Sequence, residues 1–162
     1  MKYLTLIIAS LILSGCSERQ SNQTKNPKTN VMTFQTTNIT ISINSSKEKV
    51  YKFASNPENF PKWLAFVQSV SKKSDGIWIA ESDLGKIEIE LSPENEFGII
   101  DHVVKLPDGT KVYNPLRVIE NGKGSEVMFT LFKMPNKTTE EFNADSELVK
   151  ADLKTLKDIL EK

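Results

Sequence analysis

The closing segment, residues 138–162, constrains the fold most, because it carries the only large apolar stripe at helical spacing in the chain. Thr138 and Glu141 have the Thr-x-x-Glu spacing of a capping box, in which each side chain binds a free backbone N–H at a helix start. The charged residues, among them Asp152, occupy much of the remaining surface of this helix. At ~1.5 Å per residue, it is roughly 35 Å long, enough to cross a small sheet. Apolar residues recur at spacings of three and four along one face: Phe142, Leu148, Val149, Leu153, Leu156, Ile159 and Leu160.

The first residues of the sequence indicate a targeting signal rather than part of the folded domain. Residues 4–13 are mostly apolar, but this run is too short to span a bilayer, which needs about 20 residues, and it fits the apolar region of a secretory signal. The run ends in Leu-Ser-Gly-Cys at residues 13–16, which resembles the lipobox of bacterial lipoproteins. The resemblance implies that residues 1–15 are cleaved and that Cys16 is lipidated as the new N-terminus. The alternative is an ordinary signal peptide with a chance cysteine.

A lipid on Cys16 would determine where the protein is located. Two or more acyl chains give stable anchoring, so we expect a lipid-anchored protein of the bacterial cell envelope. Ser17, rather than aspartate, follows the cysteine. By the sorting rule of lipoproteins, this implies the outer membrane, facing the periplasm, if the host is Gram-negative. Residues 16–33 hold the lipidated cysteine and a polar stretch without apolar periodicity, which predicts a flexible tether.

The composition excludes several classes of function. The 21 basic and 21 acidic residues balance, so no basic excess suggests a nucleic-acid partner. Cys16 is the one cysteine and His102 the one histidine, which leaves no intrachain disulfide and no Cys/His cluster for zinc. No aspartate-rich calcium loop or phosphate-binding loop is present. We therefore expect no metal, no cofactor and no nucleic-acid partner. Separately, we expect a monomer whose partner is the membrane.

The first part of the folded region predicts one strand and two short helices. Residues 38–44 alternate strictly between isoleucine and polar side chains, as in a half-buried strand. Ser45 and Glu48 repeat the capping-box spacing, which predicts a helix that follows the strand. Asn56 and Pro57 then provide an N-cap with proline at the first helical position, which predicts a second helical turn.

The rest of the chain, up to the closing segment, predicts an antiparallel meander. Turn sequences such as Asp75-Gly76, Asp108-Gly109 and Asn121-Gly122 recur every 8 to 15 residues. No long helix lies between them, so we do not expect parallel crossovers. The predicted strands are residues 66–73, 77–82, 86–92, 97–106, 111–120 and 125–134.

These elements together predict an α+β domain over residues 34–162. Its order is one strand, two small helices, six strands and the long helix. An antiparallel sheet of about seven strands twists and curls, and the closing helix is the element available to fill its concave side. A gap between a curved sheet and one long helix is commonly a ligand cavity.

The local sequences resemble the helix-grip SRPBCC superfamily, which includes START-like lipid carriers and polyketide-cyclase-like proteins. Residues 56–63, Asn-Pro-Glu-Asn-Phe-Pro-Lys-Trp, are similar to the segment after its first helix. Residues 101–104 and 115–118 are similar to its central strands, and residues 122–132 are similar to its last strand. The resemblance implies the helix-grip fold. It implies no catalytic residue set.

Alternation along the strands predicts which side chains face the cavity. His102 is the one side chain that titrates near neutral pH, so it is the candidate for a direct role with a ligand. Asp101 cannot orient it, because successive strand residues point to opposite faces. A buried amide without a hydrogen-bond partner is costly, so the Asn114 side chain is expected to bind either a ligand or a neighbouring residue or water. The full candidate cavity is Trp63, Phe66, Trp78, His102, Asn114, Phe129, Phe142, Val149 and Leu153.

Three hypotheses about function follow. The first is a membrane-anchored lipoprotein that binds a small hydrophobic or amphipathic molecule, lipid-like ones included, in a cavity under the closing helix. The second is an enzyme similar to polyketide cyclases and dehydrases that uses His102 as acid or base. The third is a non-catalytic envelope protein whose core is filled, in which His102 and the aromatic residues are ordinary core residues.

Overall fold

The computed structural model describes residues 32–162, and the predicted signal peptide, Cys16 and most of the predicted tether lie outside the described residues. Residues 33–162 form one unit that contains every helix and strand described below. Its elements in chain order are β1 (Thr36–Ile43), α1 (Lys47–Ala54), the 3-10 turn η1 (Pro57–Asn59), α2 (Phe60–Trp63), β2 (Val67–Ser74), β3 (Ile77–Ser82), β4 (Gly85–Leu91), β5 (His102–Lys105), β6 (Lys111–Asn114), β7 (Leu116–Asn121), β8 (Gly124–Phe132) and α3 (Thr139–Leu160).

The predicted capping box at the start of the closing helix is confirmed. The backbone N–H of Thr138 donates to the carboxylate of Glu141 at 2.7 Å, and the backbone N–H of Glu141 donates to the Thr138 hydroxyl at 3.1 Å. Two free N–H groups at the N-terminus of α3 are thereby satisfied, which fixes where the helix begins.

Of the two predicted N-caps of the short helical segments, the one at Asn56 is confirmed and the one at Ser45 is not. The side chain of Asn56 accepts from the backbone N–H of Glu58 at 3.1 Å, and Pro57 opens η1 as expected. In α1, however, Ser46 is the N-cap, because its hydroxyl accepts from the backbone N–H of Lys49 at 3.4 Å. The expected box at Ser45 is therefore displaced by one residue.

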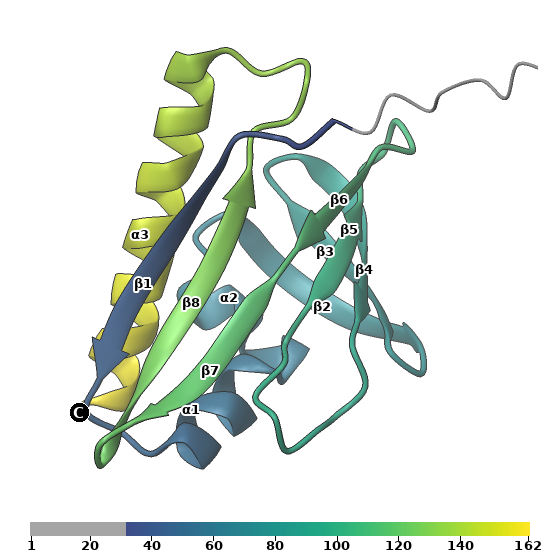
Figure 1. The fold of residues 1–162 in the computed structure, drawn as a ribbon. Helices are drawn as coiled ribbons and strands as arrows, with labels where there is room; N and C mark the ends of the chain where they lie inside the picture. The colour runs from purple at the N-terminus through teal and green to yellow at the C-terminus, as the bar shows by residue number, and fades with distance from the viewer. Residues whose placement is uncertain (1–31) are drawn as a thin grey trace, which may run out of the picture. The chain divides into compact units, whose positions relative to one another are not determined.

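The strands form two antiparallel ladders rather than one sheet of about seven strands. Their orders are β1-β8-β7 and β2-β3-β4-β5-β6, and Figure 1 shows the two groups. The expected strand over residues 111–120 is divided at Pro115, where β6 ends and β7 begins. Proline has no backbone N–H and cannot continue a ladder, so the chain leaves one sheet there and joins the other. The Pro115 carbonyl instead accepts from the backbone N–H of Thr130 at 3.0 Å.

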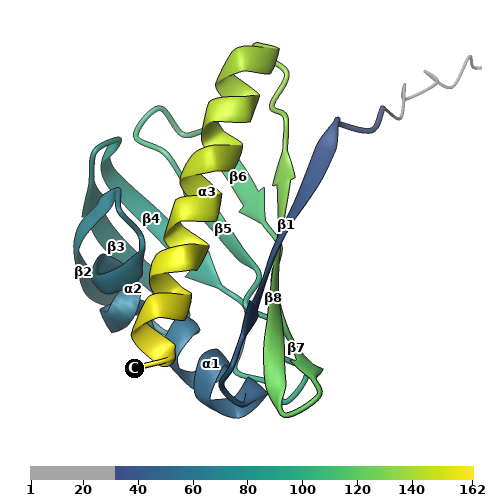
Figure 2. The same cartoon turned by 90° about the vertical axis from the view of Figure 1, so that its left-hand side faces the viewer.

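The two ladders remain joined where the chain bends. An isolated antiparallel bridge pairs Ile99 with Arg117, and the backbone N–H of Ile100 donates to the Leu116 carbonyl at 2.8 Å. This junction takes the place of the first half of the expected strand over residues 97–106. Figure 2 shows α3 lying across the side toward which both ladders turn. The α+β class, with antiparallel strands wrapped around the C-terminal helix, is thus confirmed.

Two expectations for the apolar stripe of α3 are wrong. Leu148 is 63% exposed, because it lies one residue, or about 100°, away from Val149 on the helix. Asp152, which was expected on the polar side, is only 8% exposed. The buried residues of α3 are Phe142, Ser146, Asp152, Leu153, Leu156 and Leu160. Within residues 32–162, no helix combines the length and the apolar character that a membrane crossing requires.

Candidate ligand cavity

A cavity of about 170 Å³ lies between α3, α2 and the strands. Most of its walls are aliphatic or aromatic, and three lining residues have polar side chains that can orient a ligand: His102, Asn114 and Asp152. The other lining residues are Phe60, Trp63, Leu64, Phe66, Ile100, Val104, Leu116, Phe129, Leu131, Val149 and Leu153. Mostly apolar walls with a few convergent polar groups are typical of sites for small molecules.

The structure brings together most of the side chains that the sequence singled out. Trp63, Phe66, His102, Asn114, Phe129, Val149 and Leu153 all line this cavity. Phe142 is buried near the start of α3 but does not line it. Trp78 lines a separate cleft of about 390 Å³ with residues of α1 and the following turn, because that segment, rather than α3, covers this part of β3.

The second cleft and a third hollow are larger but less suited to a specific ligand. The third hollow, also of about 390 Å³, lies at the ends of β1, β7 and β8. Its lining is chiefly polar and includes Ser42, Asn44, Asn121 and Lys123. The smaller cavity under α3 is the one that combines apolar walls with buried polar side chains.

The pairing of β5 with β6 places two of the polar groups side by side. His102 is directly opposite Asn114 in the register, so both side chains lie on the same face of the sheet. The amide nitrogen of Asn114 makes one long hydrogen bond, 3.4 Å, to the Val112 carbonyl. This weak contact leaves the amide able to bind a ligand.

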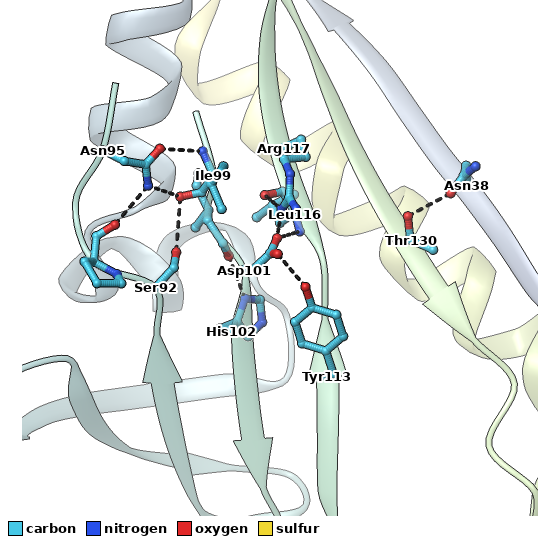
Figure 3. A network of polar contacts seen from close by, with 12 residues as sticks. Asn38, Ser92, Asn95, Ile99, Asp101, His102, Tyr113, Leu116, Arg117 and Thr130 are labelled. Atoms are coloured by element: carbon cyan, nitrogen blue, oxygen red, sulfur yellow. Dashed lines mark hydrogen bonds and ion pairs between the residues drawn. The ribbon is translucent and has the colours of Figure 1, made fainter. Parts of the chain in front are cut away.

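Asp101, the neighbour of His102, makes its own polar contacts with Tyr113, Leu116 and Arg117 (Figure 3). Its carboxylate accepts from the Tyr113 hydroxyl and from the backbone N–H of Leu116 at 3.1 Å, and it forms an ion pair with Arg117. These contacts lie on both sides of Pro115 and hold the bend between the two ladders. The expectation that Asp101 does not orient His102 agrees with this geometry.

The environment of His102 fixes its protonation. Its Nδ1 lies 3.0 Å from the carbonyl oxygen of Ile100. Because a carbonyl can only accept, Nδ1 carries the proton of the neutral ring. Burial lowers the pKa of His102 below its ordinary value of 6.5, and the hydrogen bond to Ile100 opposes that shift without cancelling it. At neutral pH the imidazole is therefore uncharged, and Nε2 carries a lone pair.

Asp152 is the polar cavity residue that sequence reasoning missed, and six apolar lining residues were missed as well: Phe60, Leu64, Ile100, Val104, Leu116 and Leu131. The Asp152 carboxylate accepts from the backbone N–H of Ala65 at 3.0 Å, which links α3 to the chain between α2 and β2. Burial raises the pKa of Asp152, and the hydrogen bond from Ala65 opposes that shift. The signal was its spacing, because position 152 follows Val149 by three and precedes Leu156 by four, on the same helix face.

One further polar atom near the cavity has no partner. The indole Nε1 of Trp63 is buried and makes no hydrogen bond among the described residues. An unmade hydrogen bond of a buried donor costs roughly 1–3 kcal/mol. The Trp63 ring packs edge-on against Phe60, with ring centroids 6.0 Å apart and planes at 90°. No group of three or more possible metal ligands occurs in the part of the chain that the structure describes.

Comparisons with known proteins give similarity in structure alone. No protein-family model and no curated protein matches the chain. An uncharacterized protein from Bacillus thuringiensis has a TM-score of 0.65 at 17% identity, over 79% of this chain and 100% of that chain. The Aha1 protein from Colwellia psychrerythraea, solved as a dimer, has a TM-score of 0.62 at 19% identity, over 78% and 96%.

A START superfamily protein from Mycobacterium smegmatis is also similar, with a TM-score of 0.60 at 14% identity, over 78% of this chain and 97% of that chain. At these identities the likeness concerns the fold. The chain has the helix-grip fold that START-like proteins share.

Proposed function

We propose that this protein binds a small hydrophobic molecule in the cavity under α3. The observation that carries the proposal is the cavity itself, about 170 Å³ of space with apolar walls and three buried or half-buried polar side chains. A helix-grip fold supports it, because a sheet that closes around one helix leaves such a space between them.

The volume favours a ligand of about the size of one ring. A dry cavity of about 150 Å³ accommodates benzene, whereas drug-sized ligands occupy pockets of about 300–1,000 Å³. About 170 Å³ is therefore enough for a six-membered ring with a short substituent. A lipid with long acyl chains would require α3 to move away from the strands.

The two tryptophans of the chain make a direct test possible, because Trp63 lines this cavity and Trp78 lines the separate cleft. In a Trp78→Phe protein, all indole emission comes from Trp63, and titration with benzyl alcohol should change it saturably. In the matched Trp63→Phe protein, emission from Trp78 should not respond. A response from Trp78 alone, or from neither, would reject the proposal.

We also propose that Cys16 is lipidated and anchors the domain to a membrane, with residues 16–33 as its tether. The support is the lipobox-like sequence at residues 13–16. Cys16→Ser should move the protein from the membrane fraction to the soluble fraction and abolish incorporation of labelled palmitate. In a Gram-negative host, Ser17→Asp should keep the lipid and shift the protein from the outer to the inner membrane. Labelling that persists in the Cys16→Ser protein would reject the anchor.

A second candidate function is proton transfer by His102. It is favoured by the Nδ1–H contact to the Ile100 carbonyl, which leaves Nε2 as a potential base in a cavity wall. General acid–base catalysis contributes about 10²–10⁴-fold to a rate. For any compound that the protein converts, His102→Gln should lower kcat by at least about 100-fold. Unchanged turnover would exclude this role.

A further inference from the structure

Asp152 gives the cavity a chemical preference. Since His102 is neutral at neutral pH, Asp152 is the one cavity-lining side chain that can carry a full charge there. Its carboxylate receives one hydrogen bond, from the backbone N–H of Ala65. No ion pair formed within residues 32–162 includes it, although its residue is only 8% exposed.

The buried carboxylate of Asp152, with one hydrogen bond and no ion pair within the described residues, lacks the positively charged partner or the several donors that usually stabilise such a group. Buried charges are normally paired or bound to several hydrogen-bond donors, because an unpaired charge in an apolar environment is strongly destabilising. The raised pKa of Asp152 has the same cause, since burial outweighs the stabilisation from Ala65. A cation placed in the cavity would supply the missing partner.

The remaining walls are suited to a cation as well. Phe60, Trp63, Phe66 and Phe129 line the same cavity. The faces of aromatic rings attract cations, by about 2 kcal/mol or more where water is excluded. No lysine or arginine lines the cavity, so a hydrophobic carboxylic acid would meet Asp152 without a compensating cation.

We propose, building on the proposed binding function, that the ligand is a protonated amine carried on a single ring. Its ammonium group donates to the Asp152 carboxylate, and its ring packs against the aromatic walls. Folding has already buried most of Asp152, so the larger dehydration cost of binding is that of the ligand's ammonium group. The cavity volume limits the ligand to one ring and a short arm.

Three probes of the same shape but different charge test this proposal: benzylamine, benzyl alcohol and benzoate. Isothermal calorimetry on the protein should show benzylamine binding at least about tenfold more tightly than benzyl alcohol, which corresponds to about 1.4 kcal/mol. Benzoate should bind most weakly. Asp152→Asn should reduce the ratio of benzylamine to benzyl alcohol affinity to about one. Asp158→Asn, which removes an exposed charge from the same helix, should leave the ratio unchanged.

The outcomes separate this proposal from the one on which it rests. If benzyl alcohol binds as tightly as benzylamine, or benzoate binds most tightly, the amine preference is refuted while ligand binding in the cavity stands. If none of the three binds, both proposals fail. Should the Asp152→Asn protein not fold, the three affinities of the unaltered protein decide the question alone.

Discussion

Filling the cavity tests the packing under α3 directly. At about 24 cal/mol per Å³, an empty volume of about 170 Å³ corresponds to about 4 kcal/mol of stability that a filled core would have. Val149 lines this space from α3. Val149→Phe adds a ring to it, and at ~0.8 kcal/mol per buried methylene, less some strain, the gain should be about 1–2 kcal/mol. The thermal midpoint should rise by roughly 3–8 °C.

The neighbouring residue provides the matched control. Leu148 is 63% exposed, so Leu148→Phe adds an aromatic ring to the same helix but outside the cavity. Its stability should stay within about 0.5 kcal/mol of the unaltered protein. Thermal unfolding followed by circular dichroism measures both variants, and a titration with benzyl alcohol should show that only Val149→Phe lowers affinity, by at least about tenfold.

The opposite result would refute the reasoning. Extra atoms in a well-packed core destabilise by about 1–3 kcal/mol. A Val149→Phe protein that is less stable by such an amount would mean that no usable space lies next to this residue. The candidate cavity would then be an ordinary core, as in the hypothesis of a structural envelope protein.

Three further predictions concern single side chains. The pKa of His102 in the folded state lies below 6.5, so as the pH falls the unfolded state binds a proton at a higher pH than the folded state does. The free energy of unfolding should therefore decrease as the pH drops below about 6.5. Thermal melts of His102→Gln at several pH values should lack this decrease. The folded pKa of Asp152 is raised above 3.8, so its charge destabilises the fold as pH rises through that pKa. Asp152→Asn keeps an acceptor for the backbone N–H of Ala65, so its melting temperature should exceed that of the unaltered protein at pH 7 and equal it near pH 3.8. Asp152→Ala removes the acceptor and should lower the stability by about 1–3 kcal/mol. A stability gain for Asp152→Asn that does not vary with pH would contradict this reasoning. Gly98→Ala should unfold at a lower urea concentration than Gly109→Ala. Both glycines have a positive φ, but only at Gly98 would an added Cβ lie 2.0 Å from the Val118 carbonyl oxygen. Equal urea midpoints for the two variants would contradict this steric clash.

Local patterns were enough to predict the order of elements. The capping box at Thr138 and the proline after Asn56 are short-range signals, and both place helix starts as predicted. Alternation in the strands also predicted that His102 and Asn114 share a face, since it depends only on the period of the backbone. The division at Pro115 was readable from its missing N–H, but the change of sheet there depends on long-range pairing with β8.

The features that sequence reasoning missed depend on packing between distant elements. Trp78 and Phe142 are apolar like the true lining residues, and only the positions of α1 and α3 decide which space each one meets. Asp152 was assigned to the polar side because it is charged, although its spacing places it on the stripe. The backbone N–H of Ala65, whose position follows from α2, is what makes its burial tolerable.

The most direct test of the central claim is a titration of the ¹⁵N-labelled protein with benzyl alcohol, followed by amide chemical shifts. Binding in the cavity predicts saturable shifts that are largest at His102, Asn114, Val149 and Asp152, with little change at Trp78. Shifts that do not saturate, or that concentrate around Trp78 and α1, would show that the space under α3 is not the binding site.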